Sequence, residues 1–169
     1  LASVNYNNSE GIFKKSNRER FSIRADMNHS MFDGKLLLNV GFVSRNNKSS
    51  SFNGSIYKTA NQYYPTIPIK NEQGDWYEAG IMGVENPVSL VMEQNNQAHS
   101  QLTRLNSTIT LKPIDGLNLQ ALVSYSKYNL QGGSYETHKH MSTIRDSRNG
   151  VAHLNADQKI DKLVNLTAE

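Results

Sequence analysis

The sequence predicts an all-β fold, in which about five long antiparallel strands form part of a transmembrane β-barrel. Three observations lead to this fold class. Apolar and polar residues alternate over long stretches, two tight turns join such stretches, and the remaining connections are long and polar. Alternation with a period of two is typical of a strand with one apolar and one polar face. Outer-membrane barrels have short turns at one end and long extracellular loops at the other.

The first pair of strands is expected on either side of an Asp-Gly turn. Residues 20–31 place apolar side chains at odd positions, and residues 36–45 restart the alternation with apolar side chains at even positions. Asp33 and Gly34 lie between the two stretches. Glycine is favoured in tight hairpin turns because it adopts positive φ without strain. The pattern therefore predicts a hairpin.

The same arrangement occurs again in the second half of the chain. Residues 104–112 and 117–126 alternate on either side of Asp115 and Gly116, and a last alternating stretch runs from about residue 152 to residue 168. These strands have roughly 10–15 residues, whereas strands of soluble sheets typically have about 5–6. Long strands favour a barrel.

Two connections, about residues 46–97 and 130–150, are long and polar. A soluble domain seldom contains loops of such length without structure. We expect a short helix near residues 52–62. A second helix is expected to start at Asn86, because asparagine is a favoured N-cap and Pro87 suits the first helical position.

Composition excludes several classes of protein. Hydrophobic residues make up 37% of the chain and charged residues 20%. The net charge is +3, and the lysines and arginines are scattered along the chain rather than gathered in a basic run. Nucleic acid is therefore not an expected partner. The chain has no cysteine, which excludes a disulfide scaffold or a thiolate metal site. It contains neither a signal peptide nor an apolar run long enough for a membrane helix.

Both ends of the chain suggest a fragment. Leu1 lacks a preceding methionine, and residues 165–169 stop within an alternating pattern. A sheet in a membrane cannot leave an edge unpaired, so a barrel of this kind requires a larger parent. Two alternatives stay open at this point: a soluble or surface-exposed β-sandwich that binds a ligand, and a passive outer-membrane porin.

Several motifs, in order along most of the chain, resemble the SusC/RagA family of TonB-dependent transporters. They are Asn5-Tyr6 with residues 10–12 and 20–29, Tyr64-Pro65-Thr66-Ile67-Pro68-Ile69 with residues 71–77, Asn86-Pro87-Val88-Ser89-Leu90, and Ile114-Asp115-Gly116-Leu117. Each motif is weakly specific, whereas their order and spacing are more so. The amino-terminal extension, TonB box and plug domain of the family are missing from this sequence.

The resemblance implies that residues 1–169 are a partial TonB-dependent receptor β-barrel domain without its plug. The parent would import oligosaccharides or peptides across the outer membrane of a Gram-negative bacterium, energised through TonB acting on the missing plug. It would form a barrel of about 22 strands. Its expected partners are outer-membrane lipid, its substrate and a SusD-like surface lipoprotein. No cofactor is expected.

Four aromatic residues of the first long loop, Tyr63, Tyr64, Trp76 and Tyr77, are candidate ligand contacts. Flat aromatic faces pack on sugar rings and peptides, and their polar tips form hydrogen bonds. The alternative, which we favour, is that these side chains tie the loop to its neighbours or to the partner lipoprotein.

Polar residues on the wet face of the strands are expected to line the barrel lumen and contact the plug. They are Arg24, Asp26, Asn28, Arg45, Arg104 and Gln120.

The sequence predicts neither a catalytic nor a metal site. No nucleophile elbow or paired carboxylate is evident, so an enzyme is not expected. His138 and His140 would lie on one side of a strand, with His153 nearby in the sequence, and two such imidazoles can bind a metal. No acidic partner has a suitable spacing, and we favour a solvated loop for these residues.

Overall fold

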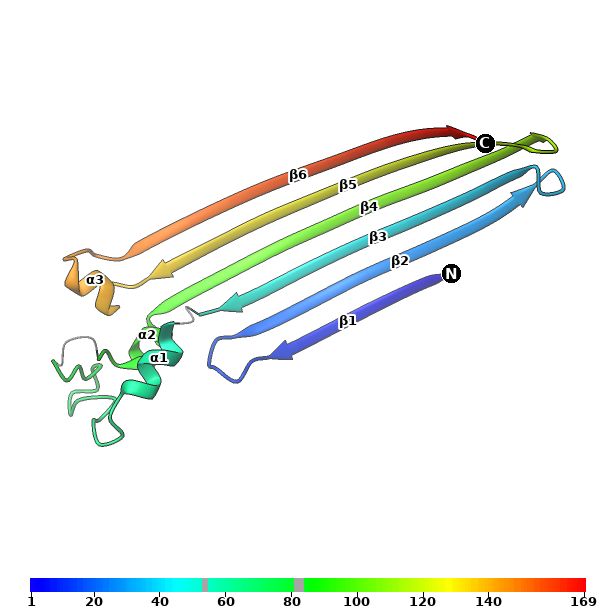
Figure 1. Cartoon of the computed structure of the whole chain (residues 1–169). Coiled ribbons are helices and arrows are strands. Elements are labelled where there is room, and N and C mark those ends of the chain that lie inside the picture. The colour runs from blue at the N-terminus through cyan, green and yellow to red at the C-terminus, as the bar shows by residue number, and fades with distance from the viewer. Residues whose placement is uncertain (53–54, 81–83) are drawn as a thin grey trace.

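A computed structural model describes residues 1–52, 55–80 and 84–169. Six antiparallel strands form one sheet, in which each strand pairs with its neighbours in the sequence (Figure 1). The strands are β1 (Ala2–Glu10), β2 (Asn17–Met31), β3 (Leu36–Ser51), β4 (Gln94–Ile114), β5 (Leu117–Glu136) and β6 (Val151–Ala168). The all-β fold class is confirmed, with six strands where about five were expected.

The strands are longer than the alternation of apolar residues indicates. β4 has 21 residues and β5 has 20, so β4 includes residues 94–97 of the first predicted loop and β5 includes residues 130–136 of the second. β1, which the alternation did not predict as a strand, pairs with β2 over its whole length. These added parts are rich in polar residues such as Ser, Asn and Gln. Backbone pairing with a neighbouring strand forms the strand there, so no alternation of apolar residues indicates it in the sequence.

Both predicted Asp-Gly turns are present. In the turn between β2 and β3, Phe32, Asp33 and Gly34 all have positive φ, and the Lys35 amide donates to the Phe32 carbonyl at 3.1 Å. In the turn between β4 and β5, Gly116 has a φ of 87°. Positive φ is the conformation that tight hairpin turns require.

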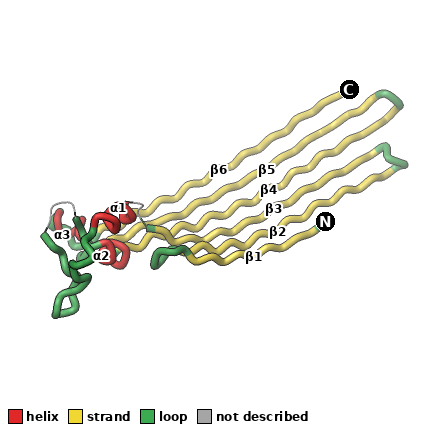
Figure 2. Tube along the Cα trace, turned by 60° about the horizontal axis from the view of Figure 1, so that its bottom comes forward, coloured by secondary structure: helices red, strands yellow, loops and turns green. Residues whose placement is uncertain are grey.

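The two Asp-Gly turns lie at one end of the sheet, and the long connections and the short turn between β1 and β2 lie at the other (Figures 1 and 2). The helix end contains α1 (Ser55–Gln62), α2 (Pro87–Met92) and α3 (Met141–Arg145). α1 and α2 confirm the two helices expected from the sequence, whereas α3 was not expected. We call these helices and the described residues around them (52, 55–80, 84–93 and 137–150) the loop cluster.

Buried hydrophobic side chains are confined to the loop cluster. Within the described residues they are Ile56, Leu90 and Val91, and Phe52 and Met141 pack against them. The sheet itself covers none of its large apolar side chains completely. Among the described residues, no helix has the length and apolar character needed to cross a membrane.

Candidate functional site

Register divides the sheet into two faces. Residues opposite each other on paired strands project to the same side, and successive residues of one strand project to opposite sides. One side carries the even positions of β1, β3 and β6 and the odd positions of β2, β4 and β5. We call this the apolar face, and the other side the polar face.

The half of the apolar face near the turns is an apolar band, interrupted by His29 on β2 and Ser107 on β4. Its members from β2 to β6 are Phe21, Ile23, Ala25, Met27, Leu36, Leu38, Val40, Phe42, Leu105, Ile109, Leu111, Leu119, Ala121, Val123, Tyr125, Val164, Leu166 and Ala168. Met27 is 51% exposed, Val123 45% and Leu166 73%. An exposed apolar surface of this extent marks a site of contact with a membrane or another protein.

The apolar face becomes polar toward the loop cluster on β1 to β5, whereas β6 keeps Ala152, Leu154 and Ala156 on it. Beyond Phe42, β3 continues on this face with Ser44, Asn46 and Lys48. Beyond Tyr125, β5 continues with Lys127, Asn129 and Gln131. The same face therefore has two chemically different surfaces, an apolar one near the Asp-Gly turns and a polar one near the loop cluster.

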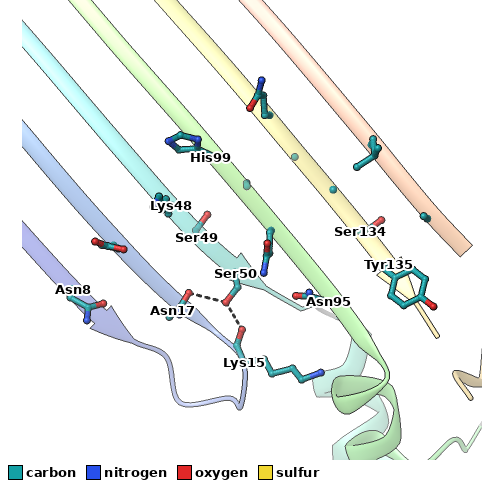
Figure 3. Close-up of a pocket in the computed structure, with 18 residues that line it drawn as sticks. Asn8, Lys15, Asn17, Lys48, Ser49, Ser50, Asn95, His99, Ser134 and Tyr135 are labelled. Carbon is teal, nitrogen blue, oxygen red and sulfur yellow. Dashed lines mark hydrogen bonds between the residues drawn. The ribbon is translucent and has the colours of Figure 1, made fainter.

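A hollow of about 1130 Å³ lies on the polar part of this face, beside the loop cluster (Figure 3). Its lining includes the amides Asn8, Asn17, Asn95, Gln97 and Gln131, the cations Lys15 and Lys48, and the carboxylate Glu19.

The rim of the hollow is held by contacts between strands and loop cluster. Ser50 Oγ lies 2.8 Å from Asn17 Oδ1 and 2.5 Å from the Lys15 carbonyl oxygen. Lys15 Nζ donates to the carbonyls of Met92, at 2.5 Å, and Gln94, at 3.3 Å. These bonds attach the turn between β1 and β2 to the end of α2.

The polar face contains all six residues predicted to face a lumen. Register places Arg24, Asp26, Asn28, Arg45, Arg104 and Gln120 on this one side.

One ion pair orders this face locally. Arg24 Nε donates to Asp26 Oδ2 at 2.6 Å, and both lie on β2. Asp26 faces Gly41 across the strand pair, where an added Cβ would lie 3.3 Å from Asp26 Oδ1. Sequence reasoning did not select Arg18, which is also on the polar face and donates to Asn47 Oδ1 at 2.9 Å.

Asn86 is the centre of the loop cluster and is completely buried. Its Oδ1 accepts from the amides of Val88 and Ser89, at 3.1 and 3.3 Å, which caps α2 as predicted. Its Nδ2 donates to the carbonyls of Ile69, at 2.7 Å, and Tyr77, at 3.1 Å. One side chain therefore fixes the start of a helix and two points of the preceding loop.

The four aromatic candidates divide into two pairs. Trp76 is half-buried, and its Nε1 donates to Glu93 Oε1 at 2.6 Å, with Lys70 Nζ 4.8 Å from the ring centroid. Tyr63 Oη donates to the Pro68 carbonyl at 3.2 Å. Both contacts tie the loop to itself. Tyr64 is 55% exposed and Tyr77 is 39% exposed, so their rings are open to solvent.

Two carboxylates of the loop cluster have shifted pKa values of opposite sign. Burial raises the pKa of Glu78, whose Oε2 accepts from the Asn86 amide at 2.9 Å. Burial alone would also raise the pKa of Glu93. Hydrogen bonds from Thr137 and Trp76, with the charges of Lys139 and Lys15, outweigh that effect and lower the pKa of Glu93 below its ordinary value.

The three histidines considered for a metal site have separate environments. His138 is exposed, and His153 is on β6 opposite Ser134. His140 is buried, and its Nδ1 accepts from the Ser142 amide at 3.2 Å as the N-cap of α3. The solvated environment expected for His140 is therefore wrong. Within the described residues, no group of three metal-ligating side chains is assembled.

Comparison with known proteins gives a likeness in structure alone. No protein-family model matches the chain, and no curated protein is significantly similar to it in sequence. The chain is similar in structure to a chain of the RagAB peptide transporter, with a TM-score of 0.69 and 17% identity. The match covers 99% of the present chain and 20% of that chain, so the present chain spans about a fifth of its length. At this identity the likeness concerns the fold.

Proposed function

We propose that this chain is part of the wall of an outer-membrane transporter that imports oligosaccharides or peptides, with energy delivered through TonB. The exposed apolar band is the observation that carries the proposal. A band of this kind opposite a polar face is what a barrel wall presents to lipid on one side and to its lumen on the other. The likeness in fold to a chain of the RagAB peptide transporter supports the same assignment.

The geometry of the strands fits this role. In β2 the apolar positions extend from Phe21 to Met31, with His29 as an interruption, which matches the length of about 9–11 residues that a tilted strand needs to cross a bilayer. The proposal requires partner strands for the free edges of β1 and β6, because unpaired backbone groups are costly in lipid.

Under this proposal the polar face, with Arg24, Asp26 and Arg104, lines the lumen and faces a plug. The loop cluster lies outside the cell, where Tyr64 and Tyr77 offer exposed rings to a sugar or peptide. The family resemblance adds a SusD-like lipoprotein as the partner that covers this end.

Uptake by cells tests the proposal. Cells that contain the natural polypeptide are supplied with radiolabelled oligopeptides or oligosaccharides, beside cells without its gene and cells without TonB. We expect uptake of one substrate class to be lost in both mutants, while uptake of a small solute that enters by general diffusion is unchanged.

Two other results would replace the proposal. Uptake that needs the gene but not TonB would identify a passive porin. A natural polypeptide found in the soluble fraction, with no effect on uptake, would identify a ligand-binding β-sandwich.

A further inference from the structure

We infer that the membrane-facing side of this sheet binds a phosphorylated glycolipid, with Lys127 and Lys162 holding its phosphate. The inference rests on the proposed function, because it takes the apolar band to lie in the membrane. It concerns the outside of the wall, and not the polar face along which a substrate would pass.

Lys127 and Lys162 form a pair at the edge of the apolar band. Register places Lys127 opposite Ile160 and Lys162 opposite Tyr125, so the two lysines are diagonal neighbours on one face. Diagonal neighbours on paired strands are close enough for long side chains to reach one anion together. Among the described residues, neither ammonium has a hydrogen-bond or ion-pair partner.

Charge on this face is segregated in a way that favours an anion. From β4 to β6, the lysines of the apolar face are Lys127 and Lys162, and every carboxylate of these strands is on the polar face. Lys48 of β3 is on the apolar face too, but it lies opposite Glu19 of β2. Like charges on neighbouring strands are unfavourable unless an anion compensates them. Basic residues at the edge of a membrane-embedded surface are attracted to the phosphates of anionic lipids.

The surfaces on either side of the lysine pair match the other parts of such a lipid. On the turn side lie Val123 and Val164 of the apolar band, which suit acyl chains. On the loop side β5 continues with Asn129 and Gln131, and Gln131 lines the hollow of Figure 3. Amide side chains both donate and accept hydrogen bonds, as the hydroxyls of a sugar headgroup require.

Along β5 the three surfaces follow one another in the order of the lipid's own parts. Val123, Lys127 and Gln131 are four residues apart in each step, which corresponds to about 13 Å between successive surfaces. A lipid with acyl chains, a phosphate and a sugar headgroup has its groups in this sequence. A phospholipid with a small headgroup would leave the hollow empty.

Binding of lipopolysaccharide, whose core sugars extend beyond its phosphates, to the purified natural polypeptide in detergent tests the inference. The probes are lipopolysaccharide with its phosphates, lipopolysaccharide after removal of the phosphates, and inorganic phosphate. The variants are Lys127→Gln, Lys162→Gln and both together. Lys159→Gln is the matched control, because Lys159 is on β6 but on the polar face, 3.5 Å from Asp161.

We expect the wild-type polypeptide to prefer the phosphorylated form. The double variant should lose about thirtyfold in affinity for it, because one lysine facing an anionic lipid is worth about fivefold. The control variant should bind as the wild type does. Equal affinity for the two forms of lipopolysaccharide, or an unchanged double variant, would overturn the inference. So would competition by inorganic phosphate, which would indicate a site for free anions.

Uptake by the same variants separates this inference from the proposed function. The double variant should keep its TonB-dependent uptake, because its lysines face away from the lumen. Equal binding of both lipids together with normal uptake would remove the inference alone. Selective binding of phosphorylated lipid by a polypeptide that imports nothing would remove the proposed function alone.

Discussion

Asn86 shows how one buried amide organises a loop that has few apolar residues. Its side chain uses both lone pairs of Oδ1 and both hydrogens of Nδ2, so none of its hydrogen-bonding capacity is left unused. A buried amide that is fully satisfied stabilises a single conformation, whereas a partly satisfied one is costly. The small apolar cluster of Ile56, Leu90 and Val91 could not specify that conformation alone.

Replacing Asn86 by alanine should loosen the loop cluster by about 2–4 kcal/mol, from the lost cap and the unpaired carbonyls of Ile69 and Tyr77. Hydrogen exchange of residues 55–80 in the natural polypeptide measures this effect. Asn61→Ala is the control, because Asn61 is exposed on α1. Equal protection in the two variants would show that Asn86 does not hold the loop.

Glu78 and Glu93 make the stability of the loop cluster depend on pH in opposite directions. The pKa of Glu93 is lower in the folded loop than its ordinary value of 4.5, so its contribution is present above that value and is lost as the pH falls through the folded pKa. The pKa of Glu78 is raised, so the loop loses stability as the pH rises from 4.5 through the folded pKa.

Two isosteric variants separate these effects. Glu93→Gln should lower the protection of the loop at neutral pH. The protection of this variant should no longer fall in acid. Glu78→Gln should raise protection at neutral pH, because it removes a buried charge. Proteolysis rates of the loop between about pH 3 and pH 7 measure both. A shift in the same direction for both variants would contradict the assigned causes.

Each strand of the sheet has apolar side chains on one face and polar side chains on the other. Adjacent residues such as Val123 and Ser124 on β5, or Leu38 and Asn39 on β3, belong to opposite faces. Along β1 to β5, however, the apolar face changes from apolar to polar toward the loop cluster. The polarity of the side chains therefore differs in two directions, between the two faces of the sheet and along the strands.

A fluorophore attached to a single introduced cysteine measures whether one face of the sheet is closer to lipid than the other. The chain has no cysteine of its own, so Val123→Cys and Ser124→Cys can be compared in a cysteine-free form of the natural polypeptide. In vesicles with brominated acyl chains, the proposed function predicts quenching at position 123 and little at position 124, because it places only the first against lipid. Lack of quenching at both positions would favour a soluble β-sandwich.

At the scale of the whole molecule, the two ends of the sheet differ in the connections that they carry. The two Asp-Gly turns and the C-terminus lie at one end, and the loop cluster lies at the other (Figure 1). The buried hydrophobic residues of the described chain are all in the loop cluster, so the sheet has no core of its own. The proposed function accounts for this exposed apolar surface by placing the sheet in a barrel wall, with lipid and further strands around it.

Local signals in the sequence determined five of the six strands, both Asp-Gly turns and two of the helices. Alternation, Asp33-Gly34, Asp115-Gly116 and the Asn86-Pro87 cap act through residues a few positions apart, so each is readable without the fold. The six residues predicted for the lumen fall on one face for the same reason, since alternation alone assigns the side of a strand.

Contacts between distant segments decided the rest. The ends of β4 and β5 lie among polar residues, where only pairing with a neighbour shows that a strand continues. The bond between Trp76 and Glu93 and the burial of His140 depend on loop segments that meet in space. Lys127 and Lys162 are 35 positions apart in the sequence and become neighbours through the register of β5 and β6. Register is a property of two strands together, so one strand's sequence does not contain it.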